Sequence, residues 1–120
     1  MKNLFKGCKN LTILDIDKIN TSLVEYMESM FNGCESLISM NLSNFDTSNS
    51  KNMEFMFNNC KSLTSINVSN FNTSLVTNME YMFSGCENLL YLDITNFNTS
   101  LTTYFENMFD NCASLIYLNI

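Results

Sequence analysis

The chain has 120 residues, enough for one domain, and 46% of them are hydrophobic, so it can bury a core. Its formal net charge is −6 and its only basic residues are six lysines, so it lacks the cationic surface needed to bind a row of phosphates, and no nucleic-acid partner is expected. No apolar run approaches the roughly 20 residues of a membrane span, so no membrane insertion is expected.

The N-terminal segment, MKNLFKGCKN, contains no apolar core of the kind that signal peptides carry. The chain is therefore expected to be intracellular, to be part of a larger protein, or to reach the outside by another route.

Residue types recur every 26 positions along the whole chain. Cysteine is one such type, at Cys8, Cys34, Cys60, Cys86 and Cys112. Phenylalanine and leucine follow the same step. A fixed period of this length indicates stacked supersecondary units, which bury their apolar sides against their neighbours. Residues 1–120 are therefore expected to form a single domain of about five coils, with no visible capping repeat.

The first recurring element in chain order is a short strand with the pattern L-x-x-L-x-L, which is the strand signature of leucine-rich repeats. The expected strands cover residues 11–16, 37–42, 63–68, 89–94 and 115–120. Alternate residues such as Leu92 and Ile94 point inward, and successive strands are expected to form a parallel sheet with a spacing of about 4.8 Å.

After each strand comes a Thr-Ser pair, and then apolar residues at three- and four-residue spacing, which predicts one short helix per coil. The Thr73 hydroxyl is an expected N-cap for one of these helices. Each helix is expected to end in a column that contains only glycine and asparagine, the residues that tolerate a left-handed backbone. That column is Gly7, Gly33, Asn59, Gly85 and Asn111. The fold class predicted from these elements is an α/β repeat.

Segments such as NMEYMFSGCENLLYLDITNFNTS and YMESMFNGCESLISMNLSNFDTS resemble the BspA-like leucine-rich repeats of bacterial surface proteins. The resemblance covers essentially the whole chain. It implies a right-handed solenoid that binds proteins or serves in adhesion, at the cell surface or outside the cell. It implies no catalytic motif and no particular binding residue.

Enzyme activity has little support in the sequence. There is no histidine to act as a base, and there is no nucleophile elbow, P-loop or glycine-rich nucleotide turn. Close cysteine pairs of the kind that bind metals are absent, so the cysteine column is expected to hold buried, reduced thiols rather than a metal or a disulfide ladder. No catalytic residue, metal or cofactor is predicted.

Polar columns also follow the period. Lys9, Glu35, Lys61 and Glu87 alternate in sign, so neighbouring coils are expected to place opposite charges side by side. Glu28, Glu54, Glu80 and Glu106 stack like charges, which indicates a solvated ridge or a site for cations. Asparagine and threonine columns are expected to hydrogen-bond along the stack and to satisfy the turns.

The likeliest binding surface is the exposed side of the strands, because repeat proteins use this surface to bind protein ligands. Its predicted residues are Ile13, Asp15, Ser39, Asn41, Ser65, Asn67, Tyr91, Asp93, Tyr117 and Asn119. Tyr91 and Tyr117 add aromatic area of the kind found at interaction hot spots.

The first and last coils read like interior coils, so both ends are expected to expose apolar surface and strand edges. Either the chain is cut from a longer array, or copies of the chain stack head to tail as structural subunits of a filament. The residues expected to form such a contact are Leu11, Leu14, Ile16, Leu115, Leu118 and Ile120.

Overall fold

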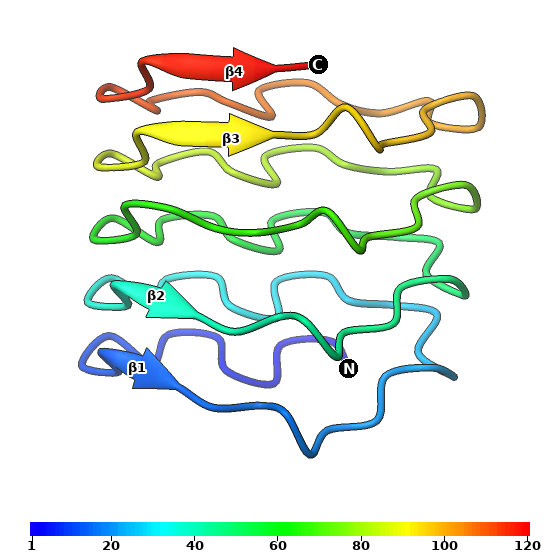
Figure 1. Ribbon diagram of the computed structural model, residues 1–120, viewed down its shortest axis with the longest axis horizontal. Coiled ribbons are helices and arrows are strands. Elements are labelled where there is room, and N and C mark those ends of the chain that lie inside the picture. The colour runs from blue at the N-terminus through cyan, green and yellow to red at the C-terminus, as the bar shows by residue number, and fades with distance from the viewer.

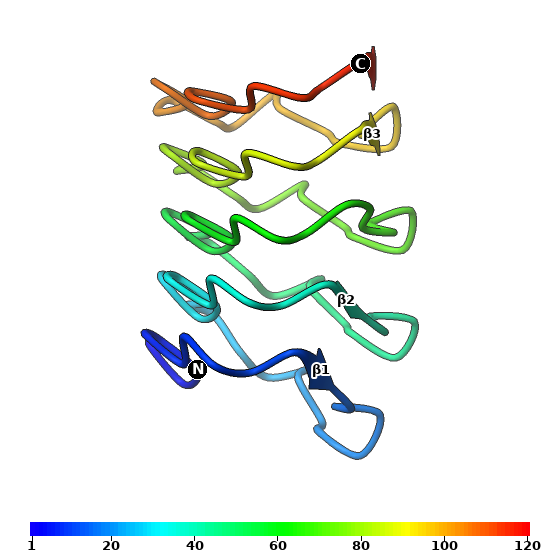
Figure 2. The same ribbon diagram turned by 90° about the vertical axis from the view of Figure 1, so that its left-hand side faces the viewer.

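The computed structural model describes all 120 residues and shows a chain that returns above itself once every 26 residues (Figures 1 and 2). We number the layers from the N-terminus as residues 1–26, 27–52, 53–78, 79–104 and 105–120. The stack is compact, with principal extents of 30 × 30 × 20 Å. The N-terminus lies in the lowest layer of Figure 1 and the C-terminus in the highest.

Regular secondary structure is sparse. The strands are β1 (Ile13–Leu14), β2 (Ser39–Met40), β3 (Tyr91–Asp93) and β4 (Tyr117–Asn119). They form two separate parallel pairs, β1 with β2 and β3 with β4, whose paired residues lie 26 positions apart. The middle layer contributes only an isolated bridge between Ser65 and Tyr91. The six-residue strands and the continuous sheet expected from the sequence are therefore wrong.

The structure contains no helix, so the predicted α/β leucine-rich-repeat solenoid, with one short helix per coil, is wrong. Two residues per layer have a left-handed backbone, for example Ser29 at φ 55° and Gly33 at φ 75°. A right-handed helix cannot continue through such residues. The glycine and asparagine column does adopt the predicted left-handed conformation, but it ends a tight turn rather than a helix.

Backbone hydrogen bonds explain why apolar residues at helical spacing do not form a helix here. The N–H groups of Met27, Ser29 and Phe31 donate to carbonyl groups of the next layer over 2.9–3.0 Å. The intervening Met30 N–H donates only three residues back, to the carbonyl of Met27 (3.2 Å). Successive three-residue turns therefore bring the methionines, the phenylalanine and Cys34 to the inside, where they are buried.

The core is a set of columns that run along the stack. Phe31, Phe57 and Phe83 are fully buried, with ring centroids 5.4 Å apart between neighbours. Phe5 and Phe109 extend the column at its two ends, with centroid distances of 5.6 and 6.0 Å. Because each ring packs on the layers above and below, an interior layer gains apolar contacts on two sides and an end layer on only one.

Threonine hydroxyls join the layers at the turn where helix N-caps were expected. The Thr47 hydroxyl donates to the Asn72 carbonyl (3.0 Å) and accepts from the Asn72 N–H (2.8 Å). Thr21 and Thr73 make the same pair of bonds with the layer above them. The expected N-caps are therefore wrong, because these hydroxyls take the place of a backbone group in the bonding between layers.

Asparagine side chains close the neighbouring turns. The Asn70 amide donates to the carbonyl groups of Leu42 and Phe45, both over 2.9 Å, in the layer below. Asn96 repeats this arrangement one layer higher. The prediction that stacked asparagine and threonine side chains hydrogen-bond along the structure is confirmed.

Candidate functional site

The strand face, defined as the exposed side of the stack around residues 13, 39, 65, 91 and 117, carries the predicted binding residues. The exposed members are Ile13, Asp15, Ser39, Asn41, Ser65, Asn67, Tyr91, Asp93 and Tyr117, whereas Asn119 is half-buried. The short strands keep them outside because alternate side chains of an extended segment point to opposite sides. In β3, for example, Leu92 is buried between exposed Tyr91 and Asp93.

Aromatic and apolar area gathers at the upper end of the strand face. Tyr91 and Tyr117 are register partners in β3 and β4, with exposed fractions of 56% and 53%. Ile116 is 73% exposed next to Tyr117. Sequence reasoning missed Ile116, although the polar residues Thr12 and Thr64 occupy the same column and indicate exposure. We call Tyr91, Ile116 and Tyr117 the tyrosine patch.

Asp93 supplies a negative charge beside the tyrosine patch. Hydrogen bonds from the backbone and hydroxyl of Thr95, and then from the Asn119 amide (3.2 Å), hold the pKa of Asp93 below its usual range. The carboxylate is therefore ionised at neutral pH and is fixed by its neighbours. An aromatic surface beside an oriented charge suits contact with another protein.

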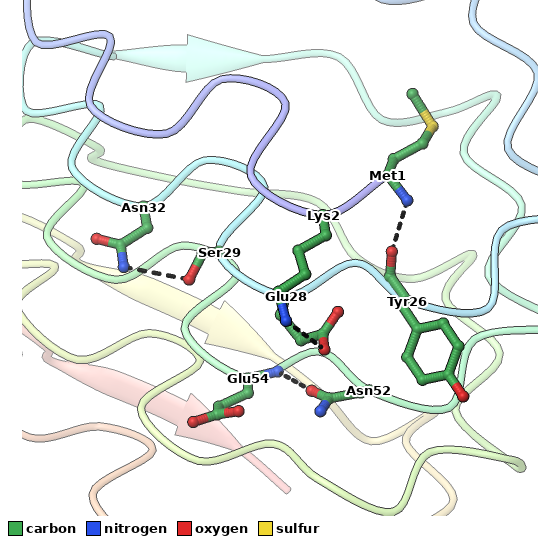
Figure 3. A network of polar contacts seen from close by, with 8 residues as sticks. All are labelled: Met1, Lys2, Tyr26, Glu28, Ser29, Asn32, Asn52 and Glu54. Atoms are coloured by element: carbon green, nitrogen blue, oxygen red, sulfur yellow. Dashed lines mark hydrogen bonds and ion pairs between the residues drawn. The ribbon is translucent and has the colours of Figure 1, made fainter.

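A polar recess of about 370 Å³ opens on another side of the first three layers. Lys2 and Glu28 approach to 3.5 Å here, and the other Glu28 carboxylate oxygen is buried without a partner (Figure 3). The N-terminal ammonium donates to the Tyr26 carbonyl (2.6 Å) at the edge of the recess. No three histidine, cysteine, aspartate or glutamate side chains are grouped as metal ligands.

A second polar recess, of about 460 Å³, lies beside the stacked rings of Phe55 and Tyr81. The ring centroids are 4.8 Å apart, and the Asn107 amide donates to the Tyr81 hydroxyl (2.8 Å). Both aromatic residues have a left-handed backbone, with φ near 55°. Neither recess contains a nucleophile paired with a base, so neither has the geometry of a covalent catalytic site.

The alternating charge column forms ion pairs between layers, as predicted for its first three members. Glu35 lies between Lys9 (3.0 Å) and Lys61 (3.4 Å). Hydrogen bonds from Lys9 and then Lys61 lower the pKa of Glu35. Glu87 makes no ion pair. The bridging carboxylate of Glu35 shows that one charged side chain can join two neighbouring layers.

The end layers expose parts of columns that are buried inside. Leu118 is 36% exposed, whereas Leu92, one layer below, is 1% exposed. Of the other residues predicted for end-to-end contact, Ile120 is 83% exposed, Leu11, Leu14 and Leu115 are half-buried, and Ile16 is buried. Ile16 therefore offers little free surface.

With this geometry in hand, the family can be stated. The family model described as "Mycoplasma protein of unknown function, DUF285" matches residues 1–117. The chain belongs to the DUF285 family. No curated protein and no solved structure matches it. The resemblance to BspA-like leucine-rich repeats is therefore corrected, because the family that matches is DUF285. The structure also lacks the helix and the continuous sheet that such repeats were expected to form.

The repeated motif of this DUF285 chain has a structural explanation in every column. Its methionines, phenylalanines, cysteines and leucines form the buried columns, and its threonines and asparagines join the layers. Surface side chains therefore have to account for the function. The structure has no helix that is both long and apolar enough to span a membrane.

All five cysteines are free. Cys34, Cys60 and Cys86 are buried, Cys112 is half-buried and Cys8 is exposed. The prediction of buried thiols is confirmed for the interior layers and wrong for Cys8. Each of the other four thiols donates to a phenylalanine carbonyl of the layer below, over 3.1–3.3 Å. Burial raises the pKa of Cys34 to about 11 and that of Cys86 to about 12, and it raises the pKa of Cys60 as well.

We expect a thiol reagent to modify Cys8 rapidly in the folded chain and to leave Cys60 and Cys86 unmodified until the chain unfolds, because the reacting species is the exposed thiolate. Mass spectrometry of peptides after a short pulse of iodoacetamide measures this difference. The raised pKa values also mean that unfolded thiols ionise first, so stability falls as pH rises from the ordinary value of 9.0 through about 11. Equal labelling of Cys8 and Cys60 under folding conditions would contradict the assignment.

Proposed function

We propose that the chain is a non-catalytic protein-interaction module of the adhesion type, which binds a protein partner through its strand face. The observation that carries this proposal is the tyrosine patch, in which two register-paired tyrosines and Ile116 remain exposed side by side. Tyrosine is enriched among the residues that dominate binding energy, because it offers a large apolar area together with a hydroxyl group.

The surroundings of the tyrosine patch support the same function. The lower rows of the strand face are small and polar, with Ser39, Asn41, Ser65 and Asn67 exposed. A partner that centres on the tyrosines can extend over these rows without meeting bulky side chains. Polar residues around a compact apolar centre are the usual arrangement at protein interfaces.

The chain offers a closely matched control for this proposal. Tyr26 and Tyr104 are 50% and 52% exposed, close to the values for Tyr91 and Tyr117. They lie 13 residues, half a period, from the strand-face column, and Tyr104 is in the same turn of chain as Tyr117. A double tyrosine-to-serine change can therefore be made on either side of the stack with the same chemistry.

We expect Tyr91→Ser/Tyr117→Ser to weaken binding of a cell-surface protein partner by roughly 30-fold or more, the loss typical of an interaction hot spot. The partner is selected on the unaltered chain from surface extracts of the organism that makes it, and its affinity is then measured by surface plasmon resonance. Tyr26→Ser/Tyr104→Ser should bind as the unaltered chain does. A partner that tolerates the change at the strand face, or that is lost with the control pair, would refute this function.

A further inference from the structure

The two end layers carry opposite charges at equivalent positions. Lys2 and Lys6 lie in the first layer, and Glu106 and Asp110 lie four periods later in the last layer. All four residues are exposed. Because side chains one period apart are neighbours along the stack, a second copy placed on top of the last layer would bring its Lys2 beside Glu106 and its Lys6 beside Asp110.

Contacts inside the chain show that such pairs form between neighbouring layers. Lys2 already approaches Glu28 to 3.5 Å in the layer above it, while its side chain remains 63% exposed. Glu35 bonds at once to a lysine above and a lysine below. A Lys2 side chain between Glu28 of its own chain and Glu106 of a second copy would repeat this arrangement with the charges reversed.

The free backbone groups of the end layers are complementary as well. Within the chain, Phe83 and Gly85 donate their N–H groups to Met108 (3.0 Å) and Asp110 (2.8 Å) in the next layer. The equivalent N–H groups of Phe109 and Asn111 in the last layer make no backbone hydrogen bond. At the other end, the carbonyl groups of Leu4 and Lys6 accept none.

The same spacing carried across a junction joins these groups. The Phe109 N–H would meet the Leu4 carbonyl of a second copy, and the Asn111 N–H would meet the Lys6 carbonyl. Phe5 of that copy would lie next to Phe109, so the phenylalanine column would continue through the contact. Charge, backbone bonding and apolar packing all require one and the same register.

We infer that residues 105–120 of one copy bind residues 1–16 of a second copy head to tail, in the register that places Lys2 beside Glu106 and Lys6 beside Asp110. The occupant of each end face is thus another copy of this chain. Burial of the end columns supplies the attraction, and the charges select the register and the orientation, because exposed ion pairs are individually weak. This contact is independent of the strand face and leaves the tyrosine patch exposed.

Charge reversal tests the contact through a rescue. In Lys2→Glu/Lys6→Glu the first layer becomes acidic, and in Glu106→Lys/Asp110→Lys the last layer becomes basic. We expect each variant alone to associate roughly 10- to 100-fold more weakly than the unaltered chain, because attractive pairs become repulsive. An equimolar mixture should associate again, since every junction between unlike variants pairs lysine with a carboxylate.

Sedimentation velocity across a wide concentration range measures the association, and circular dichroism checks that each variant is folded. Lys9→Glu/Lys18→Glu serves as the matched control: it makes the same change in net charge within the first layer, but Ala113 is the last-layer counterpart of Lys9, and Lys18 has no counterpart in residues 105–120. This control should associate as the unaltered chain does. An unaltered chain that stays monomeric, a mixture that does not associate, or a control that fails as the charge-reversed variants do would overturn the inference.

Discussion

Replacement of Phe57 by alanine should lower the free energy of unfolding by about 3–5 kcal/mol, a large part of the total stability of a domain of this size. The Phe57 ring is fully buried and packs between the rings of Phe31 and Phe83, each with its centroid 5.4 Å away. The substitution removes contacts with both neighbouring layers and leaves a cavity in the middle of the stack. Urea denaturation followed by circular dichroism measures the loss.

The control is the same substitution at the end of the column. Phe109 is half-buried and has one ring neighbour in its column, Phe83, at 6.0 Å. Phe109→Ala should therefore cost roughly half as much as Phe57→Ala, because the site loses contacts on one side and is open to water. Equal losses at Phe57 and Phe109 would mean that stability does not come from packing between neighbouring layers.

The 26-residue period predicts which side chains share a column but not the local backbone that carries them. Glycine and asparagine at positions 33 and 59 indicate a left-handed backbone, and the structure has φ values of 75° and 56° there. Phe55 and Tyr81 give no such indication, because bulky side chains rarely adopt this conformation. Their left-handed backbone, four residues before the glycine and asparagine column, makes a helix impossible although the apolar spacing favours one.

The side chains of the strand face could be predicted because alternation alone places them outside. The tyrosine pair follows from the period, since Tyr91 and Tyr117 are 26 residues apart. The two polar recesses could not be predicted, because each depends on how side chains of several layers leave space between them. Lys2 and Glu28 share a column in the sequence, but the buried and unpaired oxygen of Glu28 is visible only in the structure.

Threonine also shows how a residue can be placed correctly and interpreted wrongly. The Thr-Ser pairs mark a turn, as expected, and the aspartate or asparagine before each pair accepts from the serine N–H, as the Asp46 carboxylate does from Ser48 (2.9 Å). The threonine hydroxyl, however, bonds to the next layer rather than to a helix N-terminus. A local pattern cannot distinguish these partners, because both offer a free backbone N–H.

We expect Thr47→Val to lower the free energy of unfolding by about 2–5 kcal/mol, because it leaves two backbone groups of Asn72 without partners, each at about 1–3 kcal/mol. The side chain of Thr47 is 1% exposed, so water has little access to replace the lost bonds. Valine keeps nearly the same shape, so the loss reports the hydroxyl rather than the packing. Thermal and urea unfolding measure it.

Two further substitutions separate this bond from other effects of valine at the turn. Thr47→Ser keeps the hydroxyl and should recover most of the stability. Thr99 occupies the same position in the last turn of the stack, where it is exposed and its hydroxyl makes no hydrogen bond, so Thr99→Val should change stability by less than about 0.5 kcal/mol. If Thr47→Val and Thr99→Val were equally mild, the hydroxyl column would not hold the layers together, and the apolar columns alone would account for their stacking.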